Sequence, residues 1–325
     1  MVAPVGPGLV SRTLVIGAGG MIGRKLAARL PKEGLILHDV VPFEGASVVS
    51  DLSAPGEAEK LVASRPELIF HLAAVVSGEA EADFDKGYRV NLDGTRRLFE
   101  AIRKTGDGYQ PKLVFTSSIA VFGAPFPEAI GDEFLHAPLT SYGTQKAISE
   151  LLLSDYSRRG FFDGIGIRLP TICVRPGKPN KAASGFFSGI IREPLSGQEA
   201  VLPVPESVRH WFASPRAAIG FLLHAAALDT ARLGHRRNLS MPGVAATVGE
   251  QIAALRKVAG EKAARLIRRE PDPTIMRIVE GWPQNFDAQR ASALGFRADP
   301  SFEEIIRIHI ADELQRSPEP RTSSA

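Results

Sequence analysis

The sequence is poor in features that mark several whole classes of protein. It contains one cysteine, Cys173, so no disulfide can form within the chain, and a cytoplasmic location fits. No apolar run reaches the ~18 residues of a membrane-spanning helix, so no membrane partner is expected. The seven histidines form neither His-x-His nor His-Glu-x-x-His, and no metal site is predicted. The net charge is only +3 without a block of Lys and Arg, which argues against a nucleic-acid partner.

The first half of the chain alternates between strand-like and helix-like segments. Short apolar runs near 13–16, 35–38, 47–51, 68–74, 112–117 and 164–169 predict strands. Helices are predicted between them near 24–30, 55–64, 84–104 and 142–159. This alternation indicates an α/β protein with a Rossmann-type, doubly wound parallel sheet that carries helices on both faces.

The regular alternation of strands and helices stops after residue 169. Prolines and glycines interrupt the segment from 170 to 210, a helix and a strand follow near 215–228 and 237–240, and 247–314 is expected to be mainly helical. We therefore expect a Rossmann domain made of 13–170 and 214–242 and a smaller, mainly helical substrate lobe made of 171–213 and 243–316. A flexible leader (1–12) and a disordered tail (317–325) complete the predicted division.

A glycine-rich turn joins the first predicted strand to the first helix. Gly17, Gly20 and Gly23 lie at the turn, and Met21 and Ile22 stand between the last two of these glycines. Strand, glycine turn and helix are the context of a dinucleotide-binding fingerprint, in which the helix N-terminus receives a pyrophosphate. The spacing Gly-x-x-Gly-x-x-Gly departs from the commoner Gly-x-Gly-x-x-Gly.

An acidic residue ends the second predicted strand. Asp39 lies 22 residues after Gly17, near the ~20 expected for a carboxylate that binds the adenosine ribose. No Arg or Lys follows it to meet a 2′-phosphate, which favours NAD over NADP. The alternative is an ordinary turn aspartate.

Several candidate residues fall where predicted strands end. Because ligands bind at the carboxyl ends of the strands in such sheets, these positions are expected to share one edge. They are Gly17, Asp39, Asp51, Ala73, Ser118 and Pro170.

A tyrosine and a lysine lie four residues apart near the start of the helix predicted at 142–159. Positions i and i+4 share a helix face, so the ammonium of Lys146 is expected beside the phenol of Tyr142. A free tyrosine has a pKa of ~10, and bringing it near 7 takes roughly 4 kcal/mol of preferential phenolate stabilisation. The alternative is a pair on a solvated helix face.

With these motifs assembled, the chain resembles the extended short-chain dehydrogenase/reductase superfamily over nearly its whole length. Within that superfamily it is similar to the D-erythronate dehydrogenase family, and residues 70–91, 116–125 and 160–189 carry that closer match. The superfamily motifs are the glycine turn, Asp39, Asp51-Leu52, His71-Leu72-Ala73-Ala74, Asn91, Thr116-Ser117-Ser118 and Tyr142-x-x-x-Lys146.

The resemblance implies a catalytic set of Ser118, Tyr142 and Lys146. Tyr142 is expected to act as the general base, Lys146 to lower its pKa and hold the nicotinamide ribose, and Ser118 to orient the reacting oxygen. Further contacts to NAD are implied for Asp51, Leu52, Ala73, Ala74, Asn91, Pro170 and Thr171. Asn91 could equally be an asparagine at a helix bend whose hydrogen bonds are all made within the protein.

The segment 175–181 contains three cations and no acid, which suits a carboxylate substrate, although a solvated basic loop is the alternative. Substrate contacts are expected from Ser77, Ser118, Tyr142, Arg175, Lys178, Asn180 and Arg209.

These observations predict NAD-dependent oxidation of a small sugar acid. The resemblance alone implies the particular substrate and product, D-erythronate and 2-dehydro-D-erythronate. A nucleotide-sugar epimerase or dehydratase that keeps its NAD, and a non-catalytic NAD-sensing protein, are the alternatives. The predicted helices at 84–104 and 142–159 could pair across a two-fold axis in a homodimer.

Overall fold

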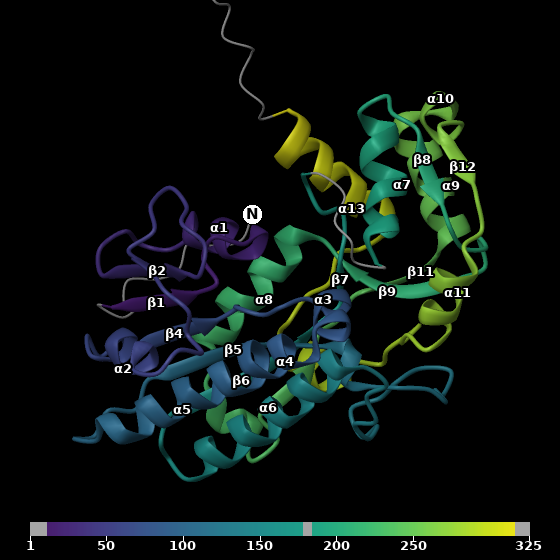
Figure 1. Cartoon of the computed structure of the whole chain (residues 1–325). Helices are drawn as coiled ribbons and strands as arrows, with labels where there is room; N and C mark the ends of the chain where they lie inside the picture. The colour runs from purple at the N-terminus through teal and green to yellow at the C-terminus, as the bar shows by residue number, and fades with distance from the viewer. Residues whose placement is uncertain (1–11, 178–183, 316–325) are drawn as a thin grey trace, which may run out of the picture.

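The computed structural model describes residues 12–177 and 184–315. Its centre is a parallel sheet whose strands follow the order β10-β6-β5-β4-β1-β2-β3 (Figure 1). The strands are β1 (Thr13–Ile16), β2 (Leu35–Asp39), β3 (Val48–Val49), β4 (Leu68–His71), β5 (Lys112–Ser118), β6 (Asp163–Leu169) and β10 (Asn238–Ser240). The predicted Rossmann-type sheet is thus confirmed, with β3 shorter than expected.

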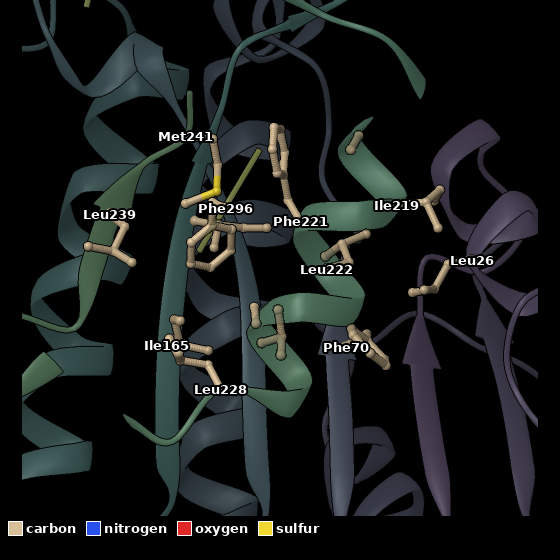
Figure 2. Packing of buried hydrophobic residues seen from close by; sticks show 14 of the residues in the cluster. Leu26, Phe70, Ile165, Ile219, Phe221, Leu222, Leu228, Leu239, Met241 and Phe296 are labelled. Carbon is tan, nitrogen blue, oxygen red and sulfur yellow. The ribbon is translucent and has the colours of Figure 1, made fainter. Parts of the chain in front are cut away.

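Both faces of this sheet are covered by helices, because successive side chains of a strand point to opposite faces. Leu14 and Ile16 of β1 pack on one side with α2 (Glu57–Val62), α5 (Gly94–Thr105) and α6 (Ser141–Arg158). Val15 packs on the other side, with α1 (Met21–Ala27) and α8 (Pro215–Ala227). Figure 2 shows Ile219 and Leu222 of α8 and Leu26 of α1 in this second layer.

A second cluster of elements lies beyond the carboxyl edge of the sheet, at the upper right of Figure 1. It contains a sheet ordered β11-β9-β7 and a pair β12-β8. Its strands are β7 (Thr171–Ile172), β8 (Ala200–Leu202), β9 (Arg209–Ala213), β11 (Val244–Thr247) and β12 (Ile267–Arg269). Its helices are α7 (Gly185–Leu195), α9 (Val248–Ala259), α10 (Glu261–Ala264), α11 (Pro273–Glu280), α13 (Phe302–His309) and the π-helical turn η4 (Ile310–Leu314).

Two expectations about secondary structure are confirmed with added detail. The helix expected at 84–104 is a continuous helical run made of α4 (Phe84–Gly87), the π-helical turn η1 (Tyr88–Asp93) and α5. The region 247–314 is mainly helical as expected, and it also contains β12, which pairs in parallel with β8. The remaining short elements are α3 (Ser77–Ala82), α12 (Gln289–Ala293) and the 3₁₀ turns η2 (Ile119–Val121) and η3 (Thr230–Leu233).

The fold brings the predicted site to one edge of the large sheet. The parallel register pairs Ser118, the last residue of β5, with Leu169, the last residue of β6. Thr171 follows two residues later and begins β7, which pairs with β9 of the second cluster. The carboxyl edge of the sheet therefore faces the second cluster. Among the residues described, no helix is long and apolar enough to cross a membrane.

Candidate active site

The glycine turn after β1 is built by close backbone contacts. Gly17 has φ +88°, and a Cβ on it would lie 2.6 Å from the Ala73 nitrogen. A Cβ on Gly23 would lie 2.2 Å from the Gly17 oxygen, so this glycine lets α1 pack on the turn. At Gly20 the nearest atom, 3.5 Å away, is again the Gly17 oxygen. The open side of Gly20, at the N-terminus of α1, fits the pyrophosphate of a dinucleotide.

Asp39 closes the turn from the next strand. Its Oδ2 accepts a hydrogen bond from the Gly19 nitrogen at 2.9 Å, and its Oδ1 accepts one from the Val41 nitrogen at 3.1 Å. A Cβ at Gly19 would lie 3.0 Å from Oδ2 and 2.9 Å from a Phe43 ring carbon. Gly19 therefore has a definite role in holding Asp39, a role that the glycine pattern in the sequence did not reveal.

The neighbouring strand ends carry the other predicted cofactor residues. Asp51 accepts hydrogen bonds from Ser53 and pairs with Arg89 at 2.6 Å, and Leu52 is buried beside it. Ala73, half-buried like Ala74, contacts the glycine turn through its backbone.

Asn91 ties the loop after β4 to α6. Within the π-helical turn η1, its side chain accepts a hydrogen bond from the Val75 nitrogen at 2.8 Å and donates to the Val75 oxygen and to Gln145. The amide is therefore fully engaged inside the protein.

Tyr142 lies beside Ser118 because two helical pieces approach very closely. Gly143 allows this approach, since a Cβ there would lie 2.1 Å from the Ala120 oxygen in η2. Thr140 caps α6 by accepting a hydrogen bond from the Gly143 nitrogen at 3.0 Å. Burial raises the pKa of Tyr142, while the hydrogen bond with Ser118 and the positive charge of Arg175 lower it.

Lys146 lies one turn along α6 and points inward. Its Nζ donates to the Thr116 oxygen at 2.8 Å and lies 5.8 Å from the centroid of the Tyr142 ring. Burial lowers the pKa of Lys146 to about 7, and the negative charge of Glu150 opposes that shift. Ser118, Tyr142 and Lys146 thus lie close together between the end of β5 and the start of α6.

A buried ion pair supports this part of α6. Arg168 donates to both carboxylate oxygens of Glu150, at 2.7 and 2.9 Å, and Ser117 donates to it at 2.5 Å. Burial alone would raise the pKa of Glu150, but Arg168 and His136 hold it at about 2. The carboxylate stays charged, and its field favours the ammonium form of Lys146.

Arg175 is the best placed of the predicted substrate cations. It is half-buried, donates to the Ile172 oxygen at 3.1 Å and to Ser184 at 3.3 Å, and has no carboxylate partner within the described ranges. Burial lowers the pKa of Arg175. The positive charge of Arg175 lowers the pKa of Tyr142, so Arg175 lies close enough to influence the predicted base.

The other predicted substrate residues are less clearly placed. Arg209 pairs with Glu250 at 3.5 Å and is partly exposed, so its charge is already matched. Ser77 begins α3, which packs against α6. Lys178 and Asn180 lie outside the described residues. Pro170 is buried at the end of β6, and Thr171 donates or accepts a hydrogen bond with His210 at 2.7 Å.

Some residues of the site escaped sequence reasoning. His210 had no recognisable motif, and only the structure brings it to Thr171. Gly143 follows Tyr142 directly, so a search for small residues beside the predicted base would have found it. Glu150 follows Lys146 by one helical turn, a spacing that could have indicated its influence.

This geometry, a parallel sheet with a glycine turn, a strand-end acid and a Ser/Tyr/Lys cluster, defines an NAD-dependent enzyme class. A model of the "NAD dependent epimerase/dehydratase family" matches residues 13–236. The chain belongs to this family.

Comparison with individual proteins narrows the assignment. The chain is 47% identical to a D-erythronate dehydrogenase of Cupriavidus necator, over 92% of this chain and 98% of the relative. It is 41% identical to a D-erythronate dehydrogenase of Haemophilus influenzae, over 93% of this chain and all of the relative. A crystal structure described as a nucleoside-diphosphate-sugar epimerase from Agrobacterium tumefaciens is 64% identical, with a TM-score of 0.90, and covers 98% of this chain and 99% of its own.

Proposed function

We propose that this protein oxidises D-erythronate to 2-dehydro-D-erythronate with NAD as the oxidant. The observation that carries the choice of an acid substrate is Arg175, a half-buried cation near Tyr142 that lacks a carboxylate partner within the described residues. A bound carboxylate would supply that partner through a charge-assisted hydrogen bond. The similarity to two D-erythronate dehydrogenases supports the particular acid.

The proposed chemistry uses the three clustered side chains. Tyr142 takes the proton of the substrate hydroxyl, and Ser118 holds that oxygen by a hydrogen bond. Lys146 keeps a positive charge near the phenol, which offsets the burial that raises the pKa of Tyr142. Bound NAD supplies the acceptor for the hydride that leaves the carbinol carbon.

The cofactor is expected to lie along the carboxyl edge of the large sheet. The open face of Gly20 and the first turn of α1, with Met21, Ile22 and Gly23, fit the pyrophosphate. The Asp39 carboxylate is held at the end of β2, where it can accept from ribose hydroxyls and repel a 2′-phosphate. Asp51, Leu52, Ala73, Ala74, Pro170 and Thr171 complete the proposed cofactor contacts, and Asn91 supports them indirectly by holding the Val75 backbone in the loop after β4.

The description of the 64% identical structure favours a second candidate, a nucleotide-sugar epimerase. Such an enzyme uses the same side chains but regenerates its own NAD, so it gives no net NADH. The two candidates therefore differ in a measurable product.

The test compares D-erythronate with erythritol, the neutral polyol, while NADH is measured. Losing one charge-assisted contact costs roughly 1.5–3 kcal/mol, so erythritol should react about ten- to a hundredfold less efficiently. Arg175→Met should lower kcat/KM for erythronate by a similar factor and change erythritol little.

Arg209→Met is the matched control, since Arg209 already has Glu250 as its partner. Equal rates on erythronate and erythritol would show that no cation binds the carboxylate. Tight binding of UDP-sugars without NADH from erythronate would establish the epimerase instead.

We also infer the division into two lobes given above, a cytoplasmic location and a homodimer. Leu151 on α6 supports the dimer, because this large apolar side chain is 66% exposed on a helix predicted to pair. Light scattering of the purified protein tests it, and a monomeric mass contradicts it.

A further inference from the structure

His210 connects the second cluster of elements to the predicted cofactor edge. Its Nδ1 lies 2.8 Å from the Pro283 oxygen, and its Nε2 lies 2.7 Å from the hydroxyl of Thr171. A backbone carbonyl can only accept a hydrogen bond, so Nδ1 must carry a hydrogen.

The surroundings of His210 keep its ring neutral. The side chain is 3% exposed and stacks on Phe187, with ring centroids 5.2 Å apart and an interplanar angle of 3°. Phe212 and Trp282 pack around the same ring. Burial is the main reason that the pKa of His210 falls to about 4; the Pro283 hydrogen bond opposes this shift and the positive charge of Arg175 adds to it.

A neutral ring with hydrogen on Nδ1 has a bare Nε2, which can only accept. The single hydroxyl proton of Thr171 is therefore committed to His210. Toward any other group, the Thr171 oxygen can therefore only accept a hydrogen bond. Thr171 is half-buried and lies two residues beyond Leu169, the register partner of Ser118, so this residue lies at the edge of the sheet where the ligands are expected and is not fully covered by the protein.

We propose that His210 is a positioning residue that makes Thr171 an obligatory acceptor for an N–H or O–H donor of the bound ligands. Two donors have this chemistry: the carboxamide of nicotinamide and a hydroxyl of the sugar acid beyond the reacting carbon. The inference rests on the proposed function for the identity of these ligands, but the state of His210 can be read without turnover.

The direct test is ¹⁵N NMR of the histidine ring nitrogens in the full chain. We expect His210 to remain neutral with hydrogen on Nδ1 between about pH 6 and 9. His235 is exposed to solvent, and its ring signals serve as the internal control. Hydrogen on Nε2, or an imidazolium in this range, would overturn the proposal even if every sugar acid proved inert.

The functional test is a double-mutant cycle. Thr171→Val removes the acceptor, and His210→Phe frees the threonine proton, so each should lower kcat/KM about three- to tenfold. The double variant should be no worse than Thr171→Val alone. His210→Gln offers both an amide donor for Pro283 and an oxygen for Thr171, and should recover most of the activity. Additive losses at equal thermal stability would mean that His210 acts independently of Thr171.

Two analogues separate the donors. The 3-acetylpyridine analogue of NAD lacks the carboxamide N–H, and a hydroxy acid without further hydroxyls lacks the sugar donor. The effect of Thr171→Val should vanish with one of them, which identifies the donor. If the effect persists undiminished with both, Thr171 accepts from neither and the proposal is wrong. If erythronate is not oxidised, the comparison of NAD with its 3-acetylpyridine analogue can still be made from their dissociation constants, measured for wild type and for Thr171→Val.

Discussion

At the residue scale, the proposed role of Tyr142 as the base depends on the pKa of its phenol. Burial raises its pKa in the protein without ligand, so it can act as a base near neutral pH only when positive charge surrounds it. Lys146, Arg175 and the bound cofactor are the charges in question. Because the pKa of Lys146 is itself lowered to about 7, the Glu150 carboxylate matters for keeping that ammonium protonated.

Replacing Tyr142 with Phe should therefore remove turnover and leave binding intact. General base catalysis contributes typically ~10²–10⁴-fold, and we expect a loss of that size in kcat with an unchanged dissociation constant for NAD. Tyr156→Phe is the control on the same helix, since the Tyr156 hydroxyl donates to Glu100, away from the triad. A Tyr142→Phe variant with a near-normal rate would place the base elsewhere.

At the scale of elements, helix α6 is positioned by a glycine as much as by its polar residues. Adding a methyl group at Gly143 would bring Cβ within 2.1 Å of the Ala120 oxygen and push α6 away from η2. Gly143→Ala should therefore lower both kcat and the free energy of unfolding. Gly220→Ala in α8 is the matched control, because a Cβ there meets nothing within 4 Å, and it should stabilise the protein by up to ~1 kcal/mol. A fully active Gly143→Ala enzyme would contradict this account.

The same helix carries one buried and one exposed ion pair. Glu150→Gln leaves Arg168 buried without its partner and should cost about 3–5 kcal/mol of unfolding free energy at neutral pH. Asp155→Asn removes the exposed pair with Arg158 and should cost less than ~1 kcal/mol.

The pH dependence of the Glu150 variant has a definite sign. The folded pKa of Glu150 is about 2, below its usual 4.5, so its stabilisation is complete above pH ~4.5 and fades as the pH falls towards 2. The stability difference between wild type and Glu150→Gln should shrink over that window in denaturant titrations. A difference that stays constant would mean that the charge of Glu150 contributes nothing.

The elements were predictable where local pattern decides them. The strands of the large sheet are short apolar runs, and the glycine turn needs residues that tolerate positive φ or close contact. The π-helical turn was not predictable, because the contacts of Asn91 with Val75 and Gln145 come from distant parts of the chain. The pairing of β12 with β8 is likewise non-local. For the same reason Thr171 could be named from the sequence while its partner His210 could not.

At the scale of the whole molecule, the carboxyl-terminal segment joins the second cluster to the cofactor-binding part. Asp299 accepts hydrogen bonds from the Ser214 nitrogen and hydroxyl, both at 2.7 Å, at the start of α8. Asp312 pairs with Arg216 of α8 at 2.7 Å, and Glu313 pairs with Lys25 of α1. Because α1 directly follows the glycine turn, these contacts link the second cluster to the helix whose N-terminus is expected to receive the pyrophosphate.

NAD should consequently stabilise the whole chain against unfolding. A ligand that binds only the folded state at a hundred times its dissociation constant adds about 2.7 kcal/mol, and we expect added NAD to raise the unfolding midpoint in a concentration-dependent way. D-Erythronate should add a further shift when NADH is bound, since its carboxylate would give Arg175, whose charge acts on Tyr142, an ionic partner. The measurement is thermal or denaturant unfolding, with the nucleotide content of the purified protein determined beforehand.

A dehydrogenase exchanges its cofactor in every turnover, so the purified protein should contain little NAD, and added NAD should raise its unfolding midpoint. If NAD instead remains bound through purification and addition changes nothing, the chain holds its cofactor as an epimerase does.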